Sequence, residues 1–107
     1  MKQELKDRWI AALESGEYKK GRKVLCNSRG QMCCLGVLAD IEGKLTKKPK
    51  NGMPRHYHRK PNFYAILPAD SFGLSTGTQQ VLASVNDRSE TFAPVIKYIE
   101  QMVRAAE

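Results

Sequence analysis

The chain has 107 residues, of which 41% are hydrophobic and 27% charged, and its formal net charge is +7. This length suits one domain that buries about two thirds of its unfolded surface, and the balanced composition excludes wholesale disorder. No apolar run approaches the roughly 20 residues that cross a bilayer, and the first residues lack the apolar core of a secretory signal, so we expect a cytoplasmic protein. Three cysteines, two of them adjacent, fit no disulfide framework and predict free thiols.

Two helices are predicted in the first half of the chain. Over residues 2–15, apolar side chains recur at helical spacing around Trp9, and Gly16 follows as a stop signal. The apolar run over residues 32–43 fits a buried helix or a buried strand by periodicity alone. Its length and its scarcity of β-branched residues favour the helix, and Gly36 inside it predicts close packing against a neighbour.

The segments around the second helix are predicted to be irregular or extended. Residues 18–26 are interpreted as a basic loop that runs into a short strand, and residues 27–30 have the composition of a turn. Residues 44–62 hold three prolines and show no periodicity, which predicts a long basic loop or an extended hairpin arm. Residues 62–67 are compatible with a short strand that ends at Pro68.

Two further helices are predicted near the end of the chain. A short one covers residues 78–85, and a longer one follows Thr91, its expected cap, with Pro94 in its first turn. The sequence thus predicts a single α+β domain over residues 1–107, mainly helical, with three to four helices and a short β-hairpin or extended basic arm. The expected core unites the first, middle and last helices through Trp9, Leu35, Leu38, Phe92, Ile96 and Ile99.

The excess positive charge is concentrated in one segment. Seven Lys or Arg residues and no acid lie between Lys44 and Lys60, which leaves eleven basic residues against eleven acidic ones elsewhere. Histidine and tyrosine side chains are interleaved with these cations. Cations bind phosphate and aromatic rings stack on bases, so the mixture suits a nucleotide or a single strand. The alternative is a solvated loop whose charges maintain solubility.

Several short motifs run along the chain in an order that is specific in combination. They are WIAALESGEY at 9–18, CCLGVLAD at 33–40, LP at 67–68 with FGLS at 72–75, LASVND at 82–87 and TFAPVI at 91–96. In this order and wording, the chain from Trp9 to Ile99 resembles a family of small proteins encoded by bacteriophages and prophages. The family has no settled activity and no assigned catalytic residues, so the resemblance implies only a viral accessory protein that acts inside a bacterium. The chain departs from the family pattern in its longer, more basic stretch from Lys47 to Lys60 and at Pro94, where an acidic residue is typical.

Zinc binding and cysteine chemistry are both disfavoured by spacing. Cys26, Cys33 and Cys34 are not arranged as the closely spaced pairs of structural zinc sites, and His56 and His58 add only a His-x-His pair. Cysteines in an apolar run are usually buried and inert, and no set of nucleophile, base and oxyanion donors is recognisable. We therefore expect no metal, no cofactor and no enzymatic activity.

The leading hypothesis is a non-enzymatic phage protein of the host bacterial cytoplasm that binds an anionic partner. It would inhibit an anti-phage defence by sequestering a nucleotide signal or by obstructing a defence complex. A phage DNA- or RNA-binding protein is the first alternative, and a cysteine-dependent enzyme is the second. The expected ligand-binding residues are Lys47, Lys48, Lys50, Arg55, His56, Tyr57, His58, Arg59 and Lys60.

The expected partners are a nucleotide, a nucleic acid or a host defence protein, with no membrane involved. A homo-oligomer is possible, because one core of this size encloses little pocket and a small ligand can be held between subunits. If the loop is not the contact surface, a second basic cluster near Tyr18 is the next candidate. That cluster consists of Lys19, Lys20, Arg22 and Lys23.

Overall fold

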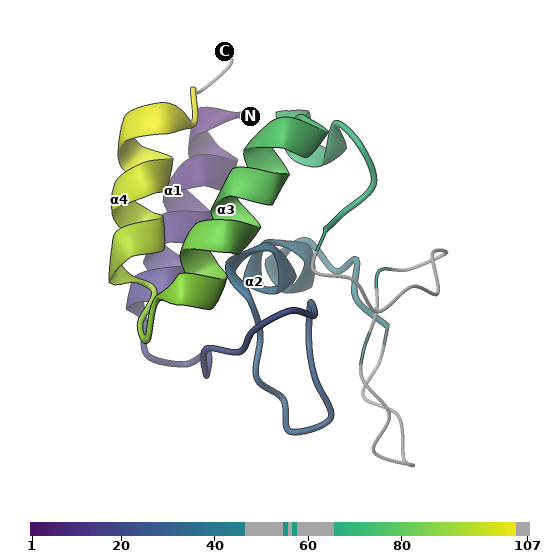
Figure 1. Cartoon of the computed structure of the whole chain (residues 1–107). Coiled ribbons are helices and arrows are strands. Elements are labelled where there is room, and N and C mark those ends of the chain that lie inside the picture. Colours follow the sequence, from purple (N-terminus) through teal and green to yellow (C-terminus); the bar gives the residue numbers. More distant parts are fainter. Residues whose placement is uncertain (47–54, 56, 58–65, 105–107) are drawn as a thin grey trace.

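The computed structural model describes residues 1–46, 55, 57 and 66–104. In this part of the chain there are four α-helices, α1 (Gln3–Glu14), α2 (Cys34–Ile41), α3 (Thr76–Arg88) and α4 (Ala93–Met102), and a 3-10 turn, η1 (Ser71–Gly73). Helix α4 stands beside α1 and α3, and α2 lies across one end of this group (Figure 1). The N-terminus and the last turn of α4 lie at the opposite end from the segment that connects α1 to α2 (Figure 1).

The core forms where α2 meets the other helices. Every residue of α2 from Cys34 to Ala39 is buried. Trp9 of α1 is fully buried, and its indole Nε1–H donates a hydrogen bond of 2.9 Å to the carbonyl oxygen of Cys34. The expected core is confirmed, with Ile96 only partly buried at its edge, and it unites the four helices.

Gly36 allows α2 to lie directly against the preceding segment. A Cβ atom at this position would be 1.8 Å from the carbonyl oxygen of Leu25, so no other residue fits this contact. The prediction of close packing at Gly36 is confirmed. The first turn of α2 is capped from Cys33, whose Sγ accepts a hydrogen bond of 3.4 Å from the N–H of Gly36.

Helix α3 is longer at both ends than the apolar pattern predicts. Ser75 begins it, because its hydroxyl accepts a hydrogen bond of 3.2 Å from the N–H of Thr78. The buried Gln79 fastens α3 to the segment before it: its Oε1 accepts from the N–H of Leu67, and its Nε2 donates to the carbonyl of Leu74. Helix α4 has a proline in its first turn, as predicted, but its N-cap is Phe92 and not Thr91, whose hydroxyl accepts a hydrogen bond of 3.3 Å from the N–H of Ala93.

The α+β class and its β-hairpin are wrong, because the described residues form helices and no strand. The chain bends over residues 22–25, where the expected strand should begin, and Lys23 within this bend has a φ of 67° in the left-handed region. Isolated β-bridges between described residues pair Lys20 with Met32, Cys26 with Met32, Cys26 with Arg55 and Leu45 with Tyr57. Of the strand expected over 62–67, residues 62–65 lie outside the described residues, and Ile66 and Leu67 belong to no regular element.

Two other expectations concern the cysteines and membranes. Cys26, Cys33 and Cys34 are all free thiols and all buried, as predicted. Across the described residues, no helix combines the length and the apolar character needed to span a bilayer.

Candidate functional site

The base of the basic loop is fastened to the core through Arg55. Its backbone N–H donates a hydrogen bond of 3.1 Å to the carbonyl of Cys26, and its Nε donates one of 2.7 Å to the carbonyl of Thr46. Its Nη2 forms an ion pair of 3.0 Å with Oδ1 of Asp40 at the end of α2. The guanidinium of Arg55 is therefore occupied within the protein, and Arg55 anchors the loop.

Asp40 also holds the segment that leads into the second basic cluster. The Tyr18 hydroxyl donates a hydrogen bond of 2.9 Å to Oδ2 of Asp40, so the two carboxylate oxygens bind one residue each. Burial and this hydrogen bond raise the pKa of Tyr18 from 10.0 to about 12. Through Asp40, the start of the segment after α1 and the base of the loop are tied to one point on α2.

The raised pKa of Tyr18 gives a testable pH dependence. Because the folded protein favours the protonated phenol, the stability that this bond contributes is full below pH 10 and is lost as pH rises from 10 to about 12. Replacing Asp40 by Asn should return the pKa of Tyr18 toward 10.0, because the carboxylate acceptor is gone. A phenolate absorbance titration, with Tyr18→Phe to identify the signal, measures this. If every tyrosine of the native protein titrated with a pKa near 10, the hydrogen bond between Tyr18 and Asp40 would be contradicted.

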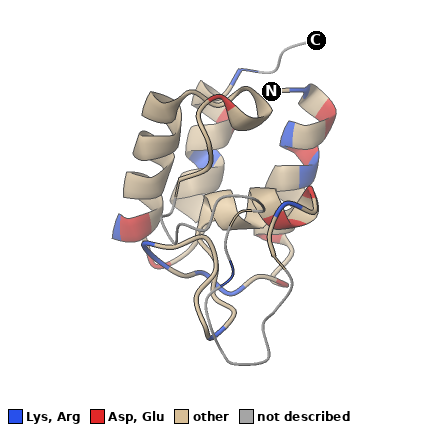
Figure 2. Cartoon of the chain, turned by 90° about the vertical axis from the view of Figure 1, so that its right-hand side faces the viewer, with Lys and Arg blue, Asp and Glu red and all other residues tan. Residues whose placement is uncertain are grey.

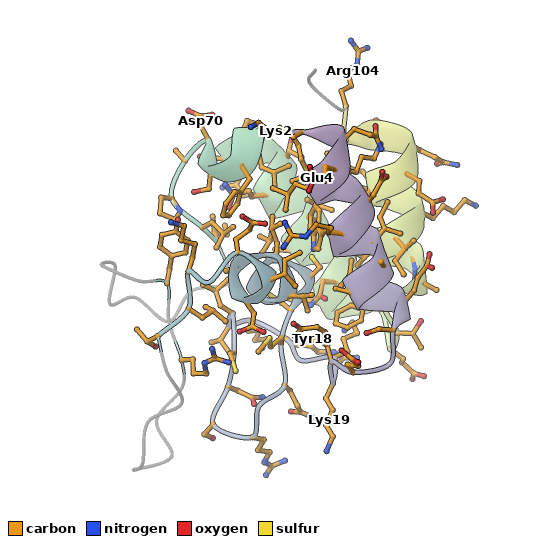
Figure 3. All side chains as sticks on the ribbon, turned by 180° about the vertical axis from the view of Figure 1, so that it is seen from behind. Lys2, Glu4, Tyr18, Lys19, Asp70 and Arg104 are labelled. Atoms are coloured by element: carbon orange, nitrogen blue, oxygen red, sulfur yellow. The ribbon has the colours of Figure 1, made fainter. Side chains whose placement is uncertain are left out.

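The four residues Lys19, Lys20, Arg22 and Lys23, here called the basic turn, continue from Tyr18. Backbone hydrogen bonds pair the turn with Met32, whose N–H donates to Lys19 at 2.8 Å and whose carbonyl accepts from Gly21 at 2.7 Å. The side chains of Lys19, Arg22 and Lys23 are exposed and that of Lys20 is half-buried. Figure 3 shows Tyr18 and Lys19 at the end of the molecule opposite to Lys2 and Arg104.

Asn86 and Asp87, at the end of α3, hold the basic turn in place. Asn86 is fully buried; its Nδ2 donates to the carbonyl of Gly21 at 3.0 Å, and its Oδ1 accepts from the N–H of Cys34 at 3.1 Å. Oδ1 of Asp87 accepts a hydrogen bond of 3.1 Å from the N–H of Lys23. Lys23 has a left-handed backbone conformation, which is strained for a residue other than glycine, and the hydrogen bond to Asp87 helps to hold it.

A second turn closes the same end of the molecule. Oδ1 of Asn27 accepts hydrogen bonds from the N–H groups of Arg29, at 2.9 Å, and of Gln31, at 3.0 Å. Nδ2 of Asn27 donates a hydrogen bond of 2.9 Å to Oε1 of Gln31. The side chain of Arg29 in this turn is exposed.

An open pocket of about 410 Å³ lies between these two turns and the connection from α3 to α4. Two cationic side chains, two amides and one carboxylate contribute to it. Burial and the neighbouring charge of Arg22 lower the pKa of Lys20. The lining residues are Lys20, Gly21, Arg22, Asn27, Gln31 and Glu90.

Only two of the predicted ligand-binding residues belong to the described part of the chain. Arg55 is ion-paired, and Tyr57 is half-buried against the core. The structure brings both to the end of the molecule that carries the basic turn, through the bond from Arg55 to Cys26. The others, Lys47, Lys48, Lys50, His56, His58, Arg59 and Lys60, lie outside the described residues.

The residues that build this end of the molecule were not predicted as a site. Asp40, Asn86 and Asp87 each bind a segment distant in sequence, and no pattern along the chain reveals such partners. The four cations around Gly21, by contrast, were named from the sequence as the next candidate surface after the loop, because they form a second basic cluster within five residues.

The buried thiols are poor nucleophiles. Burial raises the pKa of Cys33 to about 11 and raises the pKa of Cys34 well above its usual value. Among the described residues, no group of three or more His, Cys, Asp or Glu side chains is placed to hold a metal ion. His56 and His58 lie outside these residues, so the expectation about zinc stays a prediction.

A family model described as a domain of unknown function, DUF8296, matches residues 1–63. This match covers α1, the basic turn, α2 and the sequence of the basic loop up to Phe63. No curated protein and no solved structure matches the chain.

Proposed function

This chain belongs to the DUF8296 family, a domain of unknown function, and from its own residues we propose that it binds a phosphate-bearing partner, a nucleotide or a single nucleic-acid strand. The contact surface is the basic end of the molecule, defined as the basic turn, Arg29 and the loop anchored by Arg55. Binding of this kind needs cations for phosphate and rings for bases, and the sequence supplies both here.

One observation carries the proposal. The hydrogen bond from the N–H of Arg55 to the carbonyl of Cys26 sets the base of the most basic loop beside the segment that carries the basic turn. The segment after the basic turn and Arg55, at the base of the basic loop, are far apart in sequence and thus lie side by side, at the end of the molecule opposite to the N-terminus (Figure 2). Gathering like charges in one place opposes folding, so the arrangement is favoured where an anion is to be bound.

The scaffold beneath the basic turn supports a binding role over a solubilising one. A buried amide, Asn86, and a carboxylate, Asp87, hold the backbone of the turn, and Lys23 is kept in a conformation that non-glycine residues seldom adopt. Charges that serve only solubility need no such support. Strained backbone of this kind clusters at functional sites.

A binding function is favoured over a cysteine-dependent enzyme. Cys33 and Cys34 are fully buried and the pKa of each is raised, so neither thiol presents a thiolate to a substrate near neutral pH. The proposal includes no reaction.

The resemblance to phage and prophage proteins supports a role for this binding inside a host bacterium. We propose that the protein acts in the cytoplasm of a host bacterium and inhibits an anti-phage defence. Sequestering a nucleotide signal and obstructing a nucleic-acid-bound defence complex both use the phosphate chemistry of the basic end. Affinity for a free nucleotide favours the first, and affinity for a strand favours the second.

The test is a charge reversal with a matched control. Changing Lys19, Lys23 and Arg29 to Glu should weaken binding of a fluorescein-labelled single strand of about 12 nucleotides at least about tenfold, because three phosphate contacts become repulsive. The control changes three other exposed cations, Lys2, Lys97 and Arg104, to Glu, and alters the net charge equally. Lys2 and Arg104 lie at the far end of the molecule (Figure 3).

Fluorescence anisotropy measures the affinities, with a nucleoside monophosphate as a competing ligand in a second arm. The control should stay within about threefold of the native protein, and both variants should unfold within a few degrees of it, because exposed charges contribute little to folding. Equal losses in the two variants would contradict a localised site. Unchanged binding by the first variant would remove the basic turn from the function.

A further inference from the structure

We infer that the pocket beside the basic turn is a subsite for one phosphate group at the end of the bound partner. Its cations are Lys20 and Arg22, and its polar wall is formed by Asn27 and Gln31. The inference deepens the proposed function and rests on it, since it assigns one phosphate of the anionic partner to a particular place.

The two cations of the pocket extend from a backbone that is held on both sides. Lys20 and Arg22 flank Gly21, whose N–H donates to the carbonyl of Met32 at 2.7 Å and whose carbonyl accepts from Asn86 at 3.0 Å. Gly21 itself is buried, and a Cβ there would be 2.9 Å from the backbone carbon of Gln31. A backbone fixed before binding loses little entropy when a ligand arrives, so the pair is preorganised for one anion.

Hydrogen bonding within the wall leaves a donor for the ligand. Oδ1 of Asn27 already accepts two backbone N–H groups, and its Nδ2 donates to Oε1 of Gln31. The acceptor end of the Gln31 amide is used in this bond, so its Nε2 is the end left to donate. The oxygens of the Asn27 and Gln31 amides thus already accept hydrogen bonds, whereas the Gln31 Nε2 can still donate one. This arrangement suits a ligand rich in acceptor oxygens, such as phosphate.

The size of the pocket points to the end of a nucleotide. A volume of about 410 Å³ exceeds what one phosphate fills and lies toward the lower end for small-molecule pockets, so phosphate and an attached sugar fit. The pocket is open, which lets a chain of further nucleotides continue toward the exposed cations of the basic turn.

Among the described residues, Glu90 is the acid that lines the pocket, and its charge gives a test of phosphate binding there. Its carboxylate repels a phosphate that approaches Lys20 and Arg22. Removing this charge while keeping the shape of the side chain, as in Glu90→Gln, should therefore strengthen phosphate binding. A surface that only collects anions through its net charge would respond equally to the loss of any acid.

The experiment is an NMR titration of the ¹⁵N-labelled protein with inorganic phosphate and, separately, with a nucleoside monophosphate. The amide signals of Gly21, Arg22 and Gln31 should shift together and saturate. Lys20→Gln with Arg22→Gln should weaken binding at least about tenfold, and Glu90→Gln should tighten it by about threefold, since each change alters a charge next to the ligand. Lys2→Gln with Lys97→Gln is the matched control: it removes two exposed positive charges that do not line the pocket, and it should change phosphate affinity by less than about twofold.

The outcomes separate this inference from the proposed function. In one outcome, phosphate shifts the amide signals of Gly21 and Arg22 saturably, but the protein binds neither the labelled strand nor a nucleotide. This result would support the phosphate subsite and contradict the proposed function. In the other outcome, strand binding depends on the basic turn, but phosphate shifts none of these amide signals and Glu90→Gln leaves the affinity unchanged. This result would overturn the phosphate subsite alone. Spectra of the variants that overlay that of the native protein away from the pocket show that each still folds.

Discussion

Replacing Gly36 by Ala is expected to destabilise the protein by at least about 3 kcal/mol, because overpacking a buried contact against immobile backbone is among the costliest small changes. The new Cβ would lie 1.8 Å from the carbonyl oxygen of Leu25 and 2.7 Å from its carbonyl carbon. Both atoms belong to the backbone, so no side chain can rotate away. Helix α2 and the segment that carries the basic turn would have to separate.

A second glycine provides the control for this substitution. Gly77 lies in α3, and a Cβ there meets only the Ser75 hydroxyl at 4.0 Å. Gly77→Ala should therefore stabilise by about 0.5 to 1 kcal/mol, because alanine loses less backbone freedom in a helix. Urea denaturation followed by circular dichroism measures both. A loss below about 1 kcal/mol for Gly36→Ala would contradict the packing of α2 on Leu25.

Truncation of Trp9 to Ala should cost about 3 to 5 kcal/mol of unfolding free energy, a large share of the stability of a small domain. The side chain is fully buried where α1 packs on α2. Its removal leaves a cavity and deprives the carbonyl of Cys34 of the indole N–H. Trp9→Phe keeps most of the apolar volume but leaves that carbonyl without this donor, so a cost of about 1 to 3 kcal/mol is expected.

An exposed apolar residue provides the comparison for Trp9. Val81 on α3 is 43% exposed, and Val81→Ala should change the stability by less than about 0.5 kcal/mol. Since Trp9 is the single tryptophan, circular dichroism replaces fluorescence in these denaturation curves. If Trp9→Ala lost no more than Val81→Ala, the core described for α1 and α2 would be incorrect.

The helices could be predicted because their signals are local. The apolar stripe around Trp9 and the proline in the first turn of α4 are each visible within a few residues of sequence. The ends of α3 were missed because its outer turns carry polar side chains, although Ser75 was a readable cap. The expected strand failed because Leu25 and Cys26 are buried in the core, with Leu25 packed against Gly36 of α2, and an apolar run does not distinguish that environment from a sheet.

The cations of the candidate site were visible in the sequence, but their supports were not. Arg55 was counted as a ligand-binding residue, whereas its guanidinium is paired with Asp40, which is 15 residues away along the chain. Asn86 reaches across 65 residues to the carbonyl of Gly21. Tertiary hydrogen bonds of this kind carry no periodic signal, so sequence reasoning found the charges without the scaffold that holds the basic turn.

The most direct test of a localised phosphate-binding surface is the salt dependence of single-strand affinity. It is measured as the slope of the logarithm of the association constant against the logarithm of the salt concentration. Three lost phosphate contacts should make the slope of the Lys19, Lys23 and Arg29 reversal variant shallower than that of the native protein by about 2. The Lys2, Lys97 and Arg104 control should keep the native slope. Equal slopes in all three proteins would contradict the claim that the basic end binds phosphate.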